Sequence, residues 1–492
     1  MGDSSSACSV EILHQLGLTE QMVQDHIFRP DHVTAAALNV DLRNAGDGDD
    51  DPSNPPPPSG LFYSLNVQKL KRDLHDLLSG CTAGYSMQLR RYGQILFDQQ
   101  WSSARTQVDG NLDWAAYVPM HIASVSKLIT AMALTKLLYS RNISPDAHIL
   151  PWLPKYWSKG PGVDQITFRQ LLTHTSRLVP AGAVPDDQPG PSDFQFMKNQ
   201  IAIGAMGNPV YRNMNFGLCR ILISTIDEPY LFNLVGGATD QYWDLTTIRY
   251  YARYVSENVF DPVGVTSTFD HPDDNALAYP FPANVPGWNS GDLSTMSGCA
   301  GWHLSVDDLL AVMAAFRRRG FIVDPARAQT MLDRQFGLDV KKDTPLGRIY
   351  AKGGFWGLQN GRFVEQSNVF FLPKGMELAI LANSPFCKPN AGFMGNVLQA
   401  IEGQHPEQPV INYHCGGQRG SRISPVPACA STQAQTVANG QRHSRARGAH
   451  FTIARRSGLA LSSYVGPNRL LERPWAGSVW TCSSWMRLRT YP

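Results

Sequence analysis

Ser124 and Lys127, in the segment HIASVSKLITAMAL, have the types and spacing of a nucleophile and its base, and they form the only Ser-x-x-Lys in the chain. Residues three apart share one face of a helix, so the lysine amine can reach the serine hydroxyl. Backbone N–H groups at a helix start also stabilise negative charge near Ser124. A serine attacks a carbonyl only when its proton is removed. Lysine can remove it only where burial and cationic neighbours lower its pKa from about 10.4. We predict that both residues are catalytic.

Tyr211 and Asn213, in the segment VYRNMNFG, form the only Tyr-x-Asn in the chain. A phenol hydroxyl close to lysines can carry a proton between a nucleophile and a leaving group. An amide two residues later can hydrogen-bond a substrate carbonyl or hold a lysine in place. We therefore predict that Tyr211 is catalytic and that Asn213 binds substrate.

A third motif, Lys352-Gly353-Gly354, lies at the end of a predicted strand over residues 348–352. Glycines there let a substrate lie close to the strand edge, and the N–H of Phe355 can point at an oxyanion. Lys352 would add positive charge where the acyl oxygen becomes negative. We predict that these four residues bind the substrate and its oxyanion.

Periodicity and turn residues predict the elements that must position these motifs. Helices are expected over residues 67–78, 124–139, 246–258, 305–318 and 391–402. Strands are expected over residues 85–90, 94–97, 348–352, 367–372 and 377–381. Because strands at both ends flank a helical middle, we expect one sheet made from the two chain ends, with helices packed on it.

Taken in order, the three motifs resemble the signature of β-lactamases and penicillin-binding enzymes. The resemblance is to the branch in which tyrosine opens the second motif. That branch contains class C β-lactamases, family VIII esterases, D-aminopeptidases, D-alanyl-D-alanine carboxypeptidases and fungal acyltransferases of the statin side-chain type. Two further segments, ITFRQLLTHTSRL (166–178) and GCAGWHLSVDDLLAVMAAF (298–316), are similar to family segments. The resemblance covers residues 83 to about 400.

The resemblance implies an α/β (α+β) fold with an antiparallel sheet flanked by helices and a mostly helical lobe, with the site between them. It implies a serine hydrolase of the esterase type, or an acyltransferase, that uses no metal or organic cofactor. Ser124 would form an acyl-enzyme with a small ester, amide or thioester. The partners are then an acyl donor and, for transfer, an alcohol or amine. A class C-like β-lactamase or D-alanyl-D-alanine carboxypeptidase, and a non-catalytic acylated sensor, remain alternatives.

Two residues depart from the family pattern. Arg177 stands where the family usually has glycine, and Gly353 where lactamases usually have threonine or serine. Because a hydroxyl at the second position helps to bind a β-lactam's carboxylate, its absence favours an esterase or acyltransferase. His174 is interpreted as a structural, hydrogen-bonded histidine. Three aromatic residues could either line an acyl pocket or pack in the core: Trp302, Phe355 and Trp356.

At the scale of the chain, the sequence predicts three parts. Residues 1–60 form an N-terminal extension that ends in an acidic, Pro-rich linker (43–60). Residues 61–405 form the catalytic domain. Residues 406–492 hold eleven arginines, two glutamates and no lysine or aspartate, so this tail carries +9 and the remainder −7. We interpret it as a poorly ordered extension and expect no nucleic-acid partner.

The eight cysteines are sparse and lack zinc-ligand spacing, so we expect reduced thiols or core residues. The N-terminus lacks the basic and apolar regions of a signal peptide, and no run of about 18 apolar residues would span a membrane. These features predict a cytoplasmic protein without a membrane span.

Overall fold

The structure is a computed structural model of the chain. It describes residues 65–178, 194–204, 207–233, 239–358, 361–387 and 392–403. The predicted N-terminal extension with its linker and the arginine-rich tail lie outside these ranges. Their properties, and the domain boundaries drawn from them, stay predictions.

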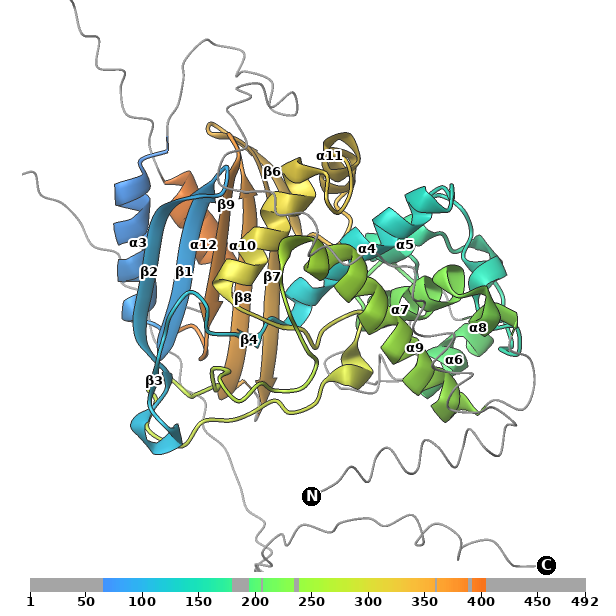
Figure 1. Ribbon diagram of the computed structural model, residues 1–492, viewed down its shortest axis with the longest axis horizontal. Coiled ribbons are helices and arrows are strands. Elements are labelled where there is room, and N and C mark those ends of the chain that lie inside the picture. The colour runs from blue at the N-terminus through green and yellow to red at the C-terminus, as the bar shows by residue number, and fades with distance from the viewer. Residues whose placement is uncertain are drawn as a thin grey trace, which may run out of the picture. The chain divides into compact units, whose positions relative to one another are not determined.

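A seven-stranded sheet forms the centre of the described chain, with the strand order β3-β2-β1-β9-β8-β7-β6 (Figure 1). Every neighbouring pair is antiparallel. The strands are β1 (Gly84–Arg91), β2 (Gln94–Arg105), β3 (Leu112–Asp113), β6 (Val340–Thr344), β7 (Gly347–Leu358), β8 (Phe363–Leu372) and β9 (Met376–Ala382). Since β1 pairs with β9, the two ends of the segment predicted to be catalytic build one sheet, and the prediction of such a sheet is confirmed.

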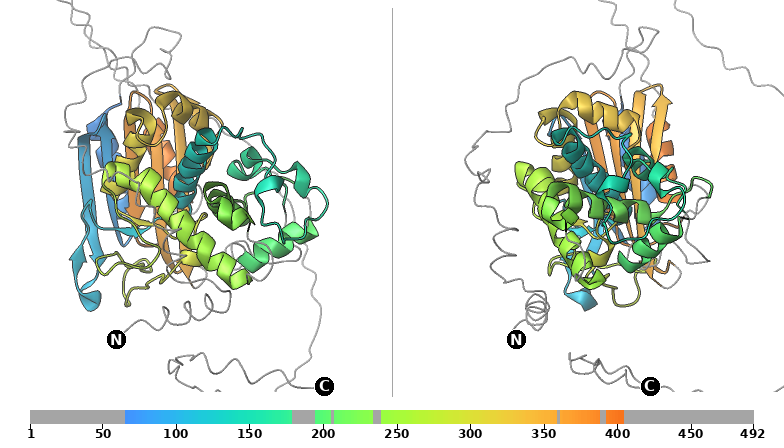
Figure 2. Two further views of the ribbon diagram at one scale, coloured as in Figure 1. Left: turned by 45° about the vertical axis from the view of Figure 1, so that its right-hand side comes forward. Right: turned by 90° about the vertical axis from the view of Figure 1, so that its right-hand side faces the viewer.

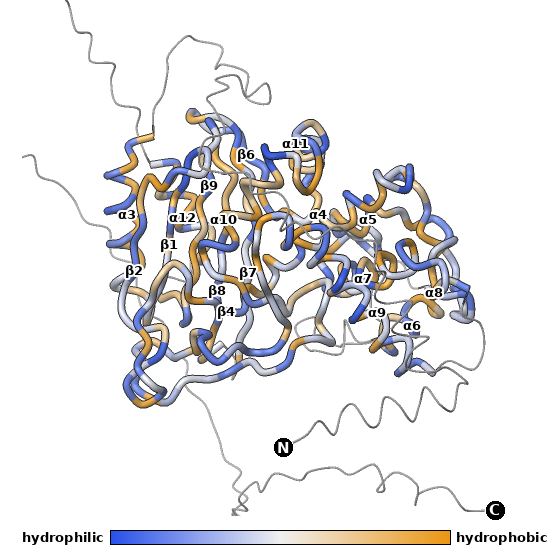
Figure 3. The backbone as a smooth tube through the Cα atoms, viewed as in Figure 1, coloured by the Kyte–Doolittle hydropathy of each residue, from blue (hydrophilic) through white to orange (hydrophobic). Residues whose placement is uncertain are grey.

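Helices cover both faces of the sheet (Figures 1 and 2). On one face pack α3 (Val67–Ser79) and α12 (Gly392–Glu402), and on the other packs α10 (Val306–Ala314). α3 presents Leu70, Leu74 and Leu78 to the sheet, because residues four apart share one helical face. Strands β8 and β9 are buried along their whole length, and Figure 3 shows hydrophobic residues recurring on these strands and on the helices.

A mostly helical lobe lies beside β7 (Figure 1). Its helices are α4 (Ser126–Ser140), α5 (Phe168–Leu172), α6 (Phe194–Ile203), α7 (Asn213–Asp227), α8 (Pro229–Asn233) and α9 (Asp240–Val255). α7 contacts α4, α5 and α9, and almost all of its residues are buried. A helix surrounded in this way carries apolar residues on all sides. The expected fold class, a sheet flanked by helices plus a helical lobe, is confirmed.

Several element boundaries differ from those predicted. β7 continues to Leu358, so the Lys-Gly-Gly motif lies inside a strand and not at its end. Pairing with β8 over the whole length of β7 outweighs the weak strand propensity of glycine. α9 starts six residues before the predicted start, where Thr239 caps it. The two-residue strands β4 (Met120–His121) and β5 (His303–Leu304) were too short to predict.

The expectation of reduced thiols was wrong for two cysteines. Cys81, after α3, and Cys387, after β9, form a disulfide bond across a sequence separation of 306 residues. Their backbones meet because β1 and β9 are neighbours, which no local spacing reveals. Cys219 and Cys299 are buried thiols. Within the described ranges, no helix is long and apolar enough to cross a membrane, and no cluster of potential ligands could hold a metal ion.

Candidate active site

Ser124 lies in a one-turn 3-10 helix (Ala123–Val125) that leads from β4 into α4. Ala123 has a positive φ of 48°, an unusual backbone conformation for a residue with a side chain. The carbonyl of Ile122 accepts a hydrogen bond from Ser367 Oγ of β8 at 2.6 Å. A Cβ atom on Gly354 would come within 2.5 Å of that carbonyl, so only glycine allows the turn to approach β7 this closely.

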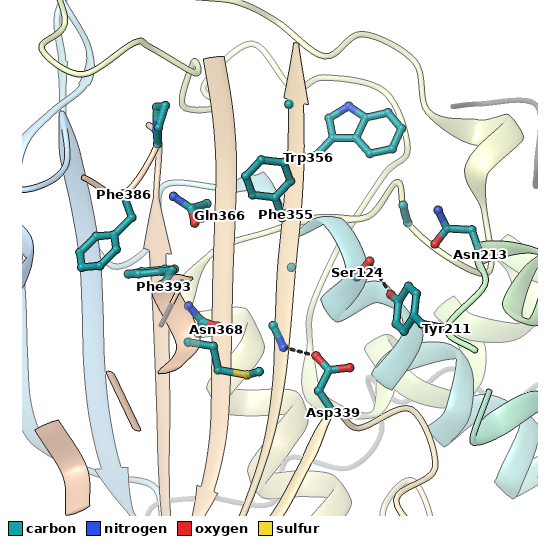
Figure 4. A pocket seen from close by; sticks show the side chains of 17 residues that line it. Ser124, Tyr211, Asn213, Asp339, Phe355, Trp356, Gln366, Asn368, Phe386 and Phe393 are labelled. Carbon is teal, nitrogen blue, oxygen red and sulfur yellow. Dashed lines mark hydrogen bonds between the residues drawn. The ribbon is translucent and has the colours of Figure 1, made fainter. Parts of the chain in front are cut away.

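The three predicted catalytic side chains meet at one oxygen atom. Lys127 Nζ donates a hydrogen bond to Ser124 Oγ at 2.9 Å, and Tyr211 OH donates to the same oxygen at 3.0 Å (Figure 4). Lys127 is fully buried and also donates to the carbonyl of Cys299 at 2.8 Å. Two groups able to accept or return a proton thus contact the predicted nucleophile.

Two lysines lie close to the ring of Tyr211. Lys127 Nζ is 5.1 Å from the centre of its ring and Lys352 Nζ is 5.0 Å away. Burial opposes ionisation of the phenol, but the charges of both lysines, with hydrogen bonds from Lys127 and Ser124, lower the pKa of Tyr211 below its ordinary value. This environment makes the phenol easier to ionise, and the resulting phenolate could accept a proton from Ser124.

His174 packs against Tyr211, with 4.1 Å between the ring centres and 31° between the ring planes. Its Nδ1 atom accepts hydrogen bonds from the backbone N–H of Arg212 at 3.3 Å and from Asn215 Nδ2 at 3.2 Å. Burial and then the nearby lysines lower the pKa of His174 to about 2, so the ring is neutral at ordinary pH. This geometry fits the interpretation of His174 as a structural histidine that holds the tyrosine.

Lys352 of the third motif forms an ion pair that sequence reasoning missed. Its Nζ donates to Asp339 Oδ1 at 2.6 Å, and the N–H of Gly353 donates to Asp339 Oδ2 at 3.0 Å. Burial alone would lower the pKa of Lys352, but interactions with Tyr211 and Asp339 raise it, so the amine stays protonated. Asp339 belongs to no motif. It reaches the site because the β6–β7 pairing places Val340 opposite Ala351.

The edge of β7 supplies a candidate oxyanion donor. The carbonyl of Ala351 accepts from the N–H of Asp339, and the N–H of Gly353 also points to Asp339, so odd-numbered residues direct their polar backbone away from β8. Because backbone direction alternates along a strand, the N–H of Phe355 points to that same edge. β7 also contacts the 3-10 helix that holds Ser124. Together with the N–H of Ser124, the N–H of Phe355 could hold an oxyanion.

A cavity of about 850 Å³ opens over these groups. Six of the eight residues predicted for the site line this cavity: Ser124, Tyr211, Asn213, Gly353, Gly354 and Phe355. A seventh, Lys352, lies next to the ring of Tyr211. Lys127 is buried behind Ser124. Figure 4 shows Phe386 and Phe393 on the opposite side of β7 from Ser124. Trp356 lines the cavity, whereas Trp302 packs in the core against Phe260 and Phe269.

A second buried polar group supports the nucleophile turn. His121 Nδ1 hydrogen-bonds Glu365 Oε2 of β8 at 2.9 Å, and His121 Nε2 accepts from the N–H of Gly301 at 3.1 Å. Both side chains are fully buried. Burial raises the pKa of Glu365 to about 7, and burial followed by the charge of Lys127 lowers that of His121 to about 3. No sequence pattern linked these residues, which are 244 positions apart.

Comparison with known proteins agrees with this architecture. Three solved structures share the fold. The octameric penicillin-binding protein homologue from Pyrococcus abyssi is 18% identical, with a TM-score of 0.52 over 68% of this chain and 77% of that one. The hydrolase EstCE1 is 17% identical, with a TM-score of 0.51 over 69% and 100%. The D-amino acid amidase from Ochrobactrum anthropi SV3 is 19% identical, with a TM-score of 0.50 over 68% and 97%.

No curated protein matches the chain. The family model described as beta-lactamase, in contrast, matches residues 72–386, which is more than half of the chain and includes all three motifs. The chain therefore belongs to the β-lactamase family, whose hydrolases are serine enzymes.

Proposed function

We propose that the protein is a serine hydrolase or acyltransferase that works through an acyl-enzyme on Ser124. The observation that carries the proposal is the contact of Lys127 Nζ and Tyr211 OH with Ser124 Oγ, at 2.9 and 3.0 Å. A nucleophile within hydrogen-bond reach of its base, with the base oriented by further groups, is the arrangement that activates a serine. The carbonyl of Cys299 orients Lys127, and His174 packs on Tyr211.

In the acylation step, Ser124 Oγ bonds to the carbonyl carbon of the donor while its proton passes to the side chain of Lys127 or to the Tyr211 phenolate. The backbone N–H groups of Ser124 and Phe355 hold the oxyanion, each worth about 10²- to 10³-fold in rate. Collapse breaks the bond to the leaving group, which takes the proton. Water or an acceptor alcohol or amine then attacks the acyl-enzyme by the same route in reverse.

The proposed substrates are small esters, amides or thioesters. The apolar and aromatic lining of the cavity, with Phe355, Trp356, Phe386 and Phe393, supports an apolar acyl group. Hydrolysis and transfer share every step up to the acyl-enzyme, so we keep both outcomes. EstCE1, with the same fold, is itself described as a hydrolase with promiscuous acyltransferase activity. A β-lactamase is less well supported, because Gly353 provides no hydroxyl to the third motif.

The test is covalent labelling with a fluorophosphonate probe, followed by intact-mass measurement. The wild type should gain one adduct and Ser124→Ala none. Ser126→Ala is the matched control, because this hydroxyl is buried two residues away and forms no hydrogen bond among the described residues. Labelling that persists in Ser124→Ala would place the nucleophile elsewhere. Acylation by p-nitrophenyl butyrate without release would instead favour the acylated sensor.

A further inference from the structure

The charge that lines the cavity is negative, although the site contains two lysines. Among the described residues that line the cavity, Asp339 is the only Asp, Glu, Lys or Arg. Lys127 and Lys352 are 0% and 1% exposed, and neither of them is among these lining residues. The charged group that an incoming molecule meets is therefore a carboxylate, whose side chain is 26% exposed.

Both oxygens of this carboxylate take hydrogen bonds from the third motif. Lys352 Nζ lies 2.6 Å from Oδ1 and the backbone nitrogen of Gly353 lies 3.0 Å from Oδ2 (Figure 4 shows the second contact). An ammonium group paired with a backbone N–H is a strong binding site for a carboxylate. Here the protein fills that site with its own side chain, so a substrate carboxylate would have to displace Asp339 or lie against it.

We propose that Asp339 is a specificity-determining residue that makes the cavity select uncharged acyl donors and reject those that carry a carboxylate. The proposal rests on the Ser124 acyl-enzyme proposed above. The remainder of the lining agrees with it, because the groups beside β7 are aromatic, thioether or amide: Phe355, Gln366, Asn368, Phe393 and Met394. None of these side chains carries a positive charge, and the desolvation of a substrate anion is costly without a cationic partner.

The size of the effect follows from Coulomb's law. Asp339 is partly exposed, so the effective dielectric constant lies between that of a protein surface and that of water. Two unit charges about 6 Å apart at a dielectric constant of about 40 interact by an energy equivalent to about a tenfold change in rate. Removal of the Asp339 charge should change the relative kcat/KM of anionic and neutral substrates by about this factor.

The experiment compares two p-nitrophenyl esters of similar length, the neutral butyrate and the anionic hemi-ester of glutaric acid. The wild type should prefer the butyrate by tenfold or more in kcat/KM. Asp339→Asn, which keeps the shape and loses the charge, should reduce this preference about tenfold. Asp343→Asn is the matched control, because it makes the same change in net charge at an exposed carboxylate on β6 outside the cavity. It should leave the preference unchanged.

Equal turnover of the two esters by the wild type would by itself overturn the inference. The inference can therefore be tested even if Asp339→Asn does not fold. An unchanged preference in a folded Asp339→Asn would overturn it as well. Both results require turnover that Ser124→Ala abolishes. If neither ester is turned over in a Ser124-dependent way, the proposed function fails instead, and the two failures are thus distinguishable.

Discussion

At the scale of single residues, the site depends on positive charge that is kept away from solvent. The amines of Lys127 and Lys352 lie 5.1 and 5.0 Å from the centre of the Tyr211 ring, and both lysine side chains are buried. The two lysines differ in their partners. Lys352 forms an ion pair with Asp339, whereas the hydrogen bonds of Lys127 go to Ser124 Oγ and a backbone carbonyl. The first is suited to a fixed charge and the second to proton transfer.

This difference predicts the effect of Lys127→Arg. Arginine keeps the positive charge but cannot act as a base, so kcat should fall by about 100-fold or more. The measurement is p-nitrophenyl butyrate hydrolysis, with thermal melting as a check on folding. Lys136→Arg on the same helix, where the lysine donates to the carbonyl of Asn258, should keep full activity. Near-normal turnover by Lys127→Arg would contradict a role as base.

Tyr211 predicts a pH dependence. Its pKa is lowered by the two lysines against the effect of burial, and the phenolate is the form that can accept a proton. The fraction of phenolate grows as pH rises through this pKa, so kcat/KM should rise with pH along a limb centred below pH 10. Tyr211→Phe should lose that limb. The same limb at a lower overall rate in the phenylalanine variant would assign the titration to another group.

At the scale of elements, β8 is the strand that holds the nucleophile turn. Two of its residues on one face, Glu365 and Ser367, hydrogen-bond His121 and the carbonyl of Ile122. His121 in turn accepts from the N–H of Gly301, close to the carbonyl that binds Lys127. One strand therefore supports both the serine and the lysine from behind.

Glu365→Gln should make the protein more stable at alkaline pH. The pKa of Glu365 is raised to about 7 in the folded state from about 4.5, so its contribution to stability is complete below pH 4.5 and is lost as pH rises through 7. Glutamine keeps the hydrogen bonds to His121 and Ser290 without ionising. We expect a gain of about 1 to 3 kcal/mol at pH 8 and little change at pH 4.5.

The measurement is urea unfolding of both proteins across this pH range. Titration of His121 has the opposite effect on stability. Because its pKa is lowered in the folded state, the unfolded state binds more protons below pH 6.5, and the free energy of unfolding rises with pH in that range. That contribution is present in both proteins and cancels in their difference. An equal stability difference at both pH values would show that Glu365 does not titrate in this way.

The sequence predicted those parts of the site that are local. Ser124 and Lys127 lie on one helical turn, and Tyr211 stands just before a helix that starts at Asn213. For residues this close in sequence, the local helical geometry alone determines their relative positions. Asp339 enters the site only through the register of β6 on β7, and Glu365 reaches His121 across 244 positions. Such contacts are set by how strands pair and helices stack, which local periodicity does not determine.

At the scale of the molecule, α12 is the last described element and completes one face of the sheet. Its residues Phe393, Val397 and Ile401 are buried in the same cluster as α3. Because the arginine-rich tail begins after this helix, truncation after about residue 405 should leave a folded enzyme with unchanged esterase activity. Truncation after residue 387, which also removes α12, should give an unfolded or inactive protein, because it exposes this face of the sheet. An inactive or insoluble protein from the first truncation would show that the tail belongs to the fold.

The disulfide bond between Cys81 and Cys387 turns most of the catalytic unit into a covalent ring. Both α3 and α12 lie outside this ring, whereas the sheet, the lobe and every predicted site residue lie inside it. A pulling force applied to the two ends of the chain would first detach these two helices from the sheet. The tension would then act on the sulfur–sulfur bond. The chain between the two cysteines, whose extended length is about 1,000 Å at about 3.5 Å per residue, could not be stretched while the bond is intact. The site is thus mechanically insulated from whatever pulls on the tails, for as long as the bond stays oxidised.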